Sequence, residues 1–227
     1  MSSSSSSPSS SSHSISIREL RLEDYDEVKN FLSKHFFATE PLMSTPGENT
    51  AVPEFEDEFH LSLIRQGLSL VAIDENHGNR IVGVALAQSQ VPNNLDEQCL
   101  EAEQRPAKCL VDKIHKFLSN LEKRANVFSS FGVERALYLY MLGVDSTVRR
   151  QGVGTRLVSS LIDLGRSKEF PVIYVTCTNQ HSAKLTTALN FKCVDSQTYA
   201  DYKDEQGKQV LQPPAPHTKA SVMAQQL

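Results

Sequence analysis

The chain has 227 residues, enough for one well-filled α/β domain, and we expect one domain or at most two. The formal net charge is −4 and the 23 Lys and Arg residues are dispersed, so nothing indicates a nucleic-acid-binding protein. The four cysteines lack Cys-x-x-Cys spacing and no secretory signal is recognisable, which favours reduced thiols in a cytoplasmic protein and argues against a metal site.

Residues 1–14 are almost entirely serine. They lack the basic start and the apolar core of a secretory signal, and they offer too little apolar surface to fold, so we expect a disordered tail. Residues 15–227 then form a single folded domain. We find no internal repeat in it and no segment apolar enough to span a membrane.

The first predicted elements are a strand at residues 15–20, which alternates apolar and polar side chains, and a helix at residues 25–35. Residues 36–53 contain three prolines and a glycine, which exclude a continuous helix and predict a shaped loop able to line a pocket. A second helix is predicted at residues 54–66.

Two strands are predicted next, at residues 68–74 and 80–90, joined by turn-forming residues as an antiparallel hairpin. Residues 91–105 are polar, and we expect no regular element there. Residues 106–124 carry apolar side chains at helical spacing and predict a long helix. No residue of this helix stands out as catalytic.

The central prediction is a buried strand at residues 136–144, followed by a short loop and a helix that ends near Arg166. The loop contains Arg149, Gly152 and Gly154. Glycines at this spacing remove side chains where the helix begins, so bare backbone N–H groups can face an anion. A phosphate group is the expected ligand.

The last predicted elements are a buried strand at residues 171–177, a short helix at 180–189, and segments at 192–202 and 218–224 that complete a mixed sheet. If the two strands that precede the two helices splay apart, the gap between them would admit a slender ligand arm.

A family resemblance accompanies these elements. The loop Arg149-Arg150-Gln151-Gly152-Val153-Gly154 resembles the pyrophosphate loop of the GCN5-related N-acetyltransferases (GNAT). Four further segments are similar, in order, to motifs of the insect arylalkylamine N-acetyltransferases, which acetylate dopamine: Thr39-Glu40-Pro41-Leu42, Cys177-Thr178-Asn179-Gln180-His181-Ser182-Ala183-Lys184, Ala200-Asp201-Tyr202-Lys203 and Pro214-Ala215-Pro216-His217. The resemblance covers residues 15–227. It implies an α/β GNAT fold, with a mixed, mostly antiparallel central sheet, splayed strands and flanking helices, and acetyl-CoA as co-substrate.

The chemistry needs a base, because an alkylamine with a pKa of about 10.4 is mostly protonated near neutral pH. The resemblance implies that Glu40, in the irregular loop before Pro41, takes the amine proton through ordered water. The alternative is a solvated loop carboxylate. Family members often carry an acidic residue immediately before this glutamate, whereas Thr39 stands here, which bears on the choice of amine.

Three further catalytic candidates come from the same resemblance. Thr178 and Ser182 lie at the start of the short helix, on one face if both are helical, and their hydroxyls are expected to orient substrate or protonate the departing thiolate. Helix capping is their alternative role. His217 matches a family histidine near the acceptor pocket, and a hydrogen-bonded scaffold role is its alternative. His181 is a weaker candidate.

The binding residues are expected in three groups. Strand-edge backbone groups should hold the pantetheine arm, the glycine-rich loop should hold the pyrophosphate with help from the helix dipole, and residues near Glu40 should form the acceptor pocket. A ligand-free β-to-α turn is the alternative for the loop, and a core position is the alternative for the two aromatic residues. The groups are Leu142, Gly143 and Val144; Arg149, Arg150, Gln151, Gly152, Val153, Gly154 and Thr155; and Phe37, Pro41 and Tyr202.

The expected activity is direct transfer, within a ternary complex, of acetyl from acetyl-CoA to a biogenic amine such as dopamine, serotonin, tyramine, octopamine or histamine. Acetylation of agmatine or a polyamine is the second enzyme hypothesis, favoured if extra carboxylates face the acceptor pocket. The third is an acyl-CoA-binding domain without turnover. A monomer whose partners are small molecules, not nucleic acid or membranes, is the default expectation.

Overall fold

The computed structural model describes residues 14–48, 57–106 and 109–227. It contains a seven-stranded sheet in the order β1-β2-β3-β4-β5-β7-β6, in which β4 and β5 are parallel and the other neighbours are antiparallel. The mixed, mostly antiparallel sheet expected from the sequence is confirmed. The strands are β1 Ile15–Glu19, β2 Leu70–Asp74, β3 Arg80–Gln90, β4 Ala136–Val144, β5 Val172–Cys177, β6 Lys192–Thr198 and β7 Lys219–Gln226.

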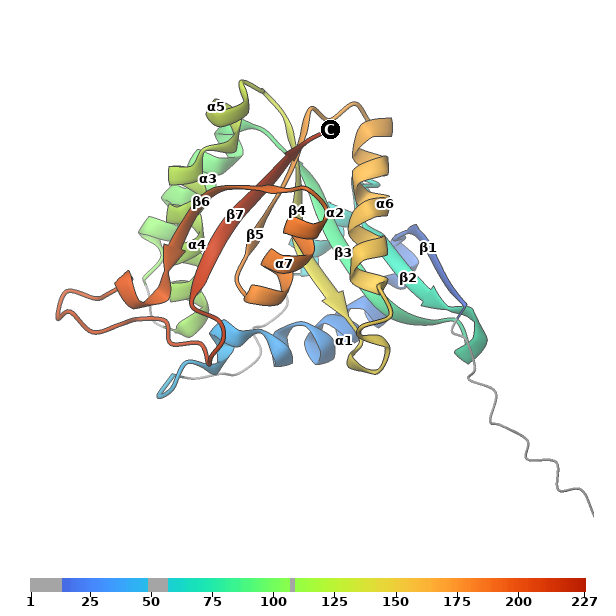
Figure 1. Cartoon of the computed structure of the whole chain (residues 1–227), viewed down its shortest axis with the longest axis horizontal. Helices are drawn as coiled ribbons and strands as arrows, with labels where there is room; N and C mark the ends of the chain where they lie inside the picture. Colours follow the sequence, from blue (N-terminus) through green and yellow to red (C-terminus); the bar gives the residue numbers. More distant parts are fainter. Residues whose placement is uncertain (1–13, 49–56, 107–108) are drawn as a thin grey trace, which may run out of the picture.

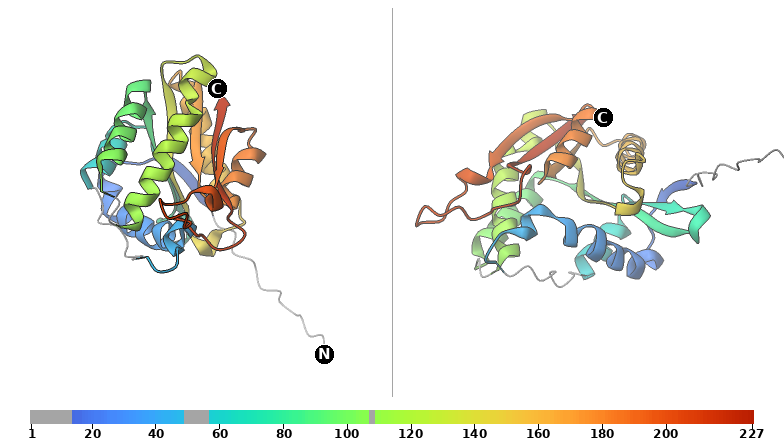
Figure 2. Two further views of the ribbon diagram at one scale, coloured as in Figure 1. Left: turned by 90° about the vertical axis from the view of Figure 1, so that its left-hand side faces the viewer. Right: turned by 60° about the horizontal axis from the view of Figure 1, so that its bottom comes forward.

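Helices cover both faces of the sheet (Figure 1). On one face, α6 packs over β2 to β5 and α7 over β5 and β7; on the other, α1 and α2 pack over β3, and α4 packs over β6 and β7 with α3 beside it. Figure 2 shows the same layers from two further sides. The helices are α1 Tyr25–His35, α2 Asp57–Arg65, α3 Pro92–Gln104, α4 Leu110–Ala125, α5 Val127–Phe131, α6 Val153–Ser167 and α7 Gln180–Ala188.

Strand β4 is buried on both faces, which explains its unbroken apolar sequence. Leu137 and Leu139 belong to the core under α6, whereas Ala136 and Tyr138 belong to the core under α4. Successive side chains of a strand point to opposite faces, so each face receives every second residue.

The two parallel strands separate soon after they pair. Residues Leu137 to Leu139 of β4 align with Ile173 to Val175 of β5, and the pairing stops there. On its other edge β4 pairs with β3 along its full length, but the register skips Tyr140, so one extra residue bulges from β4. A bulge bends a strand and increases its twist. We call the point where β4 and β5 part the fork; the splayed strands expected from the sequence are present.

The expectation of no regular element at residues 91–105 was wrong, because α3 occupies Pro92–Gln104. Pro92 stands at the first helical position, where its missing N–H costs nothing, and the Asn94 side chain accepts from the Val91 N–H at 3.1 Å. The helix buries only Leu95 and Cys99. That apolar stripe is too thin to show as helical periodicity.

Some expectations concern residues outside the described ones. These are the disorder of residues 1–13, residues 49–53 of the shaped loop, and the start of the second helix at residues 54–56. Within the described residues, no helix is both long enough and apolar enough to cross a membrane.

Candidate active site

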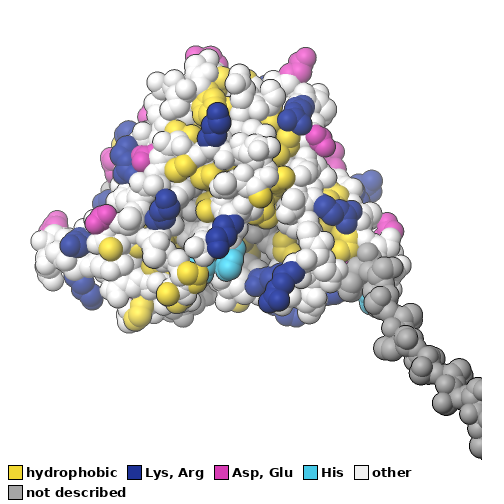
Figure 3. Space-filling model, in the orientation of Figure 1, with side chains coloured by type: hydrophobic (Ala, Val, Ile, Leu, Met, Phe, Trp, Pro, Cys, Tyr) yellow, Lys and Arg dark blue, Asp and Glu magenta, His cyan; other side chains and the backbone are white. Residues whose placement is uncertain are grey.

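A cleft of about 630 Å³ lies at the open end of the fork. It is bounded by the end of α1 and the turn after it, the end of β4, the loop into α6, and the start of α7. Figure 3 shows this face hollowed, with a histidine in the hollow and Lys and Arg side chains beside it. The lining residues are His35, Phe36, Thr39, Glu40, Pro41, Leu142, Val144, Val148, Arg149, Arg150, Gly152, Val153, Gly154, Thr155, Asn179, His181, Ser182, Leu185 and His217.

The loop into α6 has the geometry of an anion site. Arg150 and Gly152 both have positive φ angles, of 65° and 76°, and Gly152 is the residue before the first turn of α6. Alternating left-handed residues of this kind turn neighbouring N–H groups toward one point. The first turn of a helix adds N–H groups without intrahelical partners, and here they belong to Val153, Gly154 and Thr155, which line the cleft. A diphosphate fits these donors.

Close packing around the start of α6 leaves no room for a side chain at Gly154. A Cβ atom placed on it would lie 3.1 Å from the Leu185 side chain and 3.4 Å from that of Val144. Gly154 therefore lets α6 start close to both α7 and β4. At Gly152, by contrast, no heavy atom lies within 4 Å of such a Cβ, so a side chain there would point into open space.

Asp145, which precedes the same loop and is 2% exposed, fixes the loop through hydrogen bonds. Its carboxylate accepts from Arg80 at 2.6 Å and from the Thr147 N–H and hydroxyl at 2.8 and 2.9 Å. Burial alone would raise the pKa of Asp145, but these donors outweigh burial and lower it. His35 Nδ1 lies 3.8 Å from the same carboxylate, and burial lowers the pKa of this histidine.

Glu40 lines the same cleft as the loop, and its neighbour Thr39 accepts a hydrogen bond from the Arg149 side chain at 3.5 Å. Glu40 caps a short 3-10 helix, Pro41–Ser44, with its carboxylate accepting from the Leu42 N–H at 3.3 Å. The Thr178 hydroxyl is a second hydrogen-bond partner. Burial raises the pKa of Glu40, and the two hydrogen bonds oppose this shift without cancelling it. A carboxylate of this kind accepts a proton more readily than an exposed one.

Thr178 and Ser182 do not share a helix face as supposed, because α7 begins at Gln180 and Asn179 is its cap. The Asn179 side chain accepts from the N–H groups of His181 and Ser182 at 3.0 and 2.9 Å. Thr178 therefore stays in the extended segment, with its hydroxyl toward Glu40 and its carbonyl accepting from Tyr199. Ser182 lines the cleft and donates to the Asn179 carbonyl at 3.0 Å.

His217 reaches the cleft from the segment before β7. Its Nδ1 accepts from the Gln180 N–H at 3.2 Å, and its ring lies edge-on to that of His181 at 5.4 Å. A ring nitrogen that accepts carries no proton, so neutral His217 holds its proton on Nε2. Burial, and secondarily His181, lower its pKa, which favours this neutral form.

Five expected site residues do not line the cleft: Thr178, whose hydroxyl contacts Glu40 as described above, and the four that follow. Tyr202 lines a separate hollow of about 520 Å³ with Lys113 and Lys116, and its ring packs on Phe117 at 4.9 Å. Phe37 packs edge-on against Phe36, and it is Phe36 that lines the cleft. Gly143 faces α1. Gln151 belongs to the loop but does not line the cleft, although its neighbours Arg150 and Gly152 do.

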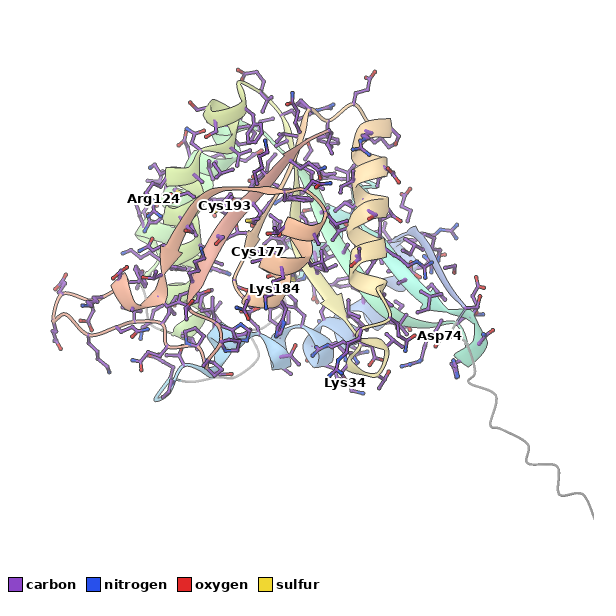
Figure 4. All side chains as sticks on the ribbon, viewed as in Figure 1. Lys34, Asp74, Arg124, Cys177, Lys184 and Cys193 are labelled. Atoms are coloured by element: carbon purple, nitrogen blue, oxygen red, sulfur yellow. The ribbon has the colours of Figure 1, made fainter. Side chains whose placement is uncertain are left out.

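Five lining residues were not anticipated as site residues: His35, Phe36, Val148, Asn179 and Leu185. Four of them stand at or beside a helix end: His35 ends α1 and Phe36 follows it, Val148 ends the 3-10 helix Ser146–Val148, and Asn179 caps α7. Only the helix boundaries would have indicated them. Figure 4 labels two lysines, Lys34 on α1 and Lys184 on α7, which are carried by two of the helices that bound the cleft.

Comparisons with known proteins agree with this architecture. A model described as the acetyltransferase (GNAT) family matches residues 32–191. The chain is 28% identical to the mosquito arylalkylamine N-acetyltransferase like 5b, with a TM-score of 0.84 over 94% of this chain and 100% of that one. Arylalkylamine N-acetyltransferase 2 from Aedes aegypti is 26% identical, with a TM-score of 0.84 over 94% and 99%.

A third similar structure is the Drosophila melanogaster polyamine N-acetyltransferase, which catalyses the formation of N-acetylagmatine. It is 28% identical, with a TM-score of 0.83 over 94% of this chain and 100% of that one. The enzyme class expected from the sequence, an N-acetyltransferase, is confirmed by these matches. Since the family model spans well over half of the chain, and the relatives are matched over nearly their whole length, the chain belongs to the GNAT family of acetyltransferases.

Proposed function

We propose that this protein is an arylalkylamine N-acetyltransferase, which transfers acetyl from acetyl-CoA to the primary amine of a biogenic amine within a ternary complex. One observation carries the proposal. A carboxylate with a raised pKa, Glu40, lines the same cleft as a loop whose bare N–H groups and arginines suit a diphosphate. A base and an acyl carrier can therefore meet in the same space.

The roles follow from the donors and acceptors present. Residues Arg149 to Thr155 hold the diphosphate, and the edge of β4 beyond Leu139 offers backbone groups to the amide-bearing arm. Glu40 takes the proton of the ammonium group, directly or through water, so that the nitrogen can attack the thioester carbonyl. The C–S bond then breaks, and coenzyme A leaves as a thiol.

The departing sulfur needs a proton or hydrogen-bond donors. The Ser182 hydroxyl and the Nε2–H of neutral His217 are the candidates, because both residues line the cleft near the start of α7. Thr178 lowers the pKa of the base, because its hydroxyl is a hydrogen-bond partner of Glu40.

The choice of a monoamine rests on charge and surroundings. Among the described residues that line the cleft, Glu40 is the single carboxylate, so nothing else there pairs with a second cation. The apolar residues that line the same cleft include Phe36, Pro41 and Leu142, which suits an aromatic ring. Agmatine or a polyamine is the second candidate, favoured by the Drosophila relative at equal identity.

The test is release of free thiol from acetyl-CoA in the presence of single amines at equal concentration. The panel is dopamine, serotonin, tyramine, octopamine, histamine, agmatine and spermidine. The proposal expects the highest kcat/KM with an aromatic or imidazole amine. A preference for agmatine or spermidine would select the second candidate. Binding of acetyl-CoA by calorimetry with no turnover of any amine would indicate a non-catalytic acyl-CoA-binding domain.

A further inference from the structure

A buried carboxylate of α4 takes no part in the cleft. Glu122 is 6% exposed and lies in a helix whose other buried residues are apolar, such as Phe117 and Leu121. Burial raises its pKa, since the charged form is disfavoured away from water, and two hydrogen bonds partly offset this cost. An apolar residue would fill the same place without that cost, so the carboxylate requires a specific explanation.

Both of these hydrogen bonds end on one oxygen and come from different strands. Glu122 Oε1 accepts from the Tyr138 hydroxyl of β4 at 2.8 Å and from the Thr176 hydroxyl of β5 at 2.5 Å. Glu122 therefore bridges two strands that are neighbours in the sheet. Figure 2 shows α4 lying along the face from which this bridge comes.

The bridge stands at the fork. Tyr138 lies within the three aligned residues of β4, and Thr176 is the first residue of β5 beyond the last aligned one, Val175. Tyr140, which bulges from β4, follows within two residues. Side-chain hydrogen bonds thus continue the connection between the strands where the backbone pairing stops.

We propose that Glu122 is a positioning residue that fixes the separation of β4 and β5 at the fork, and so sets the width of the slot for the thioester arm of acetyl-CoA. The proposal rests on the proposed function, because it assigns the slot to that arm. Glu122 itself touches no reacting atom. It acts through Tyr138 and Thr176, which hold the strand segments that lead to the cleft.

Four substitutions separate this role from simple packing. Glu122→Gln keeps an oxygen that accepts from both hydroxyls, whereas Glu122→Leu keeps the volume and loses both bonds. Tyr138→Phe removes one donor, and Tyr174→Phe is its matched control. Tyr174 is also buried and is stacked on Tyr138 at 4.5 Å, but its hydroxyl donates to Gln90.

Acetyl-CoA affinity is the first measurement, by calorimetry, together with KM for acetyl-CoA and for the amine. We expect Glu122→Leu to weaken acetyl-CoA binding about tenfold and Tyr138→Phe to weaken it severalfold, because a slot of the wrong width misplaces the arm. Glu122→Gln and Tyr174→Phe should stay within about threefold of the wild type, and KM for the amine should change less than KM for acetyl-CoA.

A purely structural role predicts a different pattern, in which the melting temperature falls and acetyl-CoA affinity does not. Arg124→Gln controls for general loosening of α4, because Arg124 ties the same helix to β6 through Asp195 at 2.6 Å and Gln197 at 2.9 Å, away from the fork. Figure 4 labels Arg124. Equal losses of affinity in Arg124→Gln and Glu122→Leu, or in Tyr174→Phe and Tyr138→Phe, would overturn the proposal.

Hydrogen exchange without any ligand tests the bridge independently of catalysis. Amides of residues 140–144 and 176–178 should exchange faster in Glu122→Leu than in the wild type, and Glu122→Gln should restore protection. Unchanged exchange in Glu122→Leu would overturn the inference even if the enzyme acetylates amines. If Glu122→Leu exchanges faster but the wild type binds no acetyl-CoA, the proposed function and the assignment of the slot are contradicted. Only the bridge between the two strands is then supported.

Discussion

The hydroxyl of Thr178, at the end of β5, is a hydrogen-bond partner of the carboxylate of Glu40, on the turn that follows α1. This contact joins two of the segments that bound the cleft, the turn after α1 and the segment that leads into α7. It also moderates the base, because burial raises the pKa of Glu40 whereas the Thr178 hydroxyl lowers it. The pKa of the base is thus raised by burial and lowered by hydrogen bonds from Thr178 and from the Leu42 N–H, and a single substitution removes the first of these bonds.

Thr178→Val should shift the acidic limb of the pH profile of kcat/KM to higher pH. The base works in its deprotonated form, and loss of a hydrogen bond to that form raises the pKa of Glu40 further. Thr178→Ser, which keeps a hydroxyl, is the control and should leave the limb near its wild-type position. If the acidic limb does not move in Thr178→Val, the Thr178 hydroxyl does not influence the pKa of the catalytic base.

Glu40→Gln should lower kcat/KM by about 10² or more and leave acetyl-CoA affinity within about threefold, because it removes the proton acceptor and leaves the anion loop intact. Turnover close to the wild-type value would remove Glu40 from the role of base.

The same substitution should stabilise the fold at neutral pH. The folded-state pKa of Glu40 is raised above 4.5, so wild-type stability falls as pH rises between the ordinary pKa and the folded one. Glutamine does not ionise, so Glu40→Gln should melt at a higher temperature than the wild type at pH 7.5. The difference should vanish below the ordinary carboxyl pKa, where both side chains are neutral. Thermal melts across this pH range give the measurement.

Features that depend on local sequence were predictable. The continuous apolar run of β4 and the glycines before α6 reflect burial on both faces and a backbone conformation, and both are visible in the residues themselves. The cap of α7 was not predictable, because Thr178 and Asn179 are both capable N-caps and the choice decides where the Thr178 hydroxyl points.

Contacts between segments distant in the sequence could not be predicted either. Tyr202 lies within a segment similar to a family motif, yet its ring packs on α4, outside the cleft. Glu122 belongs to a helix in which no residue stood out from the sequence, and its two partners lie on two different strands. Neither placement follows from spacing along the chain, because both depend on how α4 docks on the sheet.

Asp145→Asn should weaken acetyl-CoA binding about tenfold and lower stability at neutral pH. The carboxylate holds Thr147 and Arg80 behind the anion loop, and an amide cannot accept all of these bonds. The pKa of Asp145 is lowered below 3.8, so its stabilising effect is present above that value and is lost as pH falls through the folded-state pKa. The stability gap between wild type and variant should therefore close in acid, as denaturant titrations at several pH values would reveal. An equal gap at pH 7 and pH 3 would contradict this assignment.

Gly152→Ala should weaken acetyl-CoA binding at least fivefold. Gly152 has a φ of 76°, which an alanine adopts at a cost of about 1 kcal/mol, and the added methyl group would stand in the open space over the anion loop. Gly207→Ala is a matched control. Gly207 has a φ of 79° and no heavy atom within 4 Å of an added Cβ, but it lies in the turn before Lys208, away from the residues that line the cleft.

The pair separates backbone strain from ligand contact. Both variants should lose about the same stability in denaturant titrations, because the strain is the same in both. Only Gly152→Ala should raise KM for acetyl-CoA. If Gly207→Ala raises it equally, strain propagated through the fold explains the loss; if neither does, the diphosphate is not held at the start of α6, and the anion loop would need another ligand.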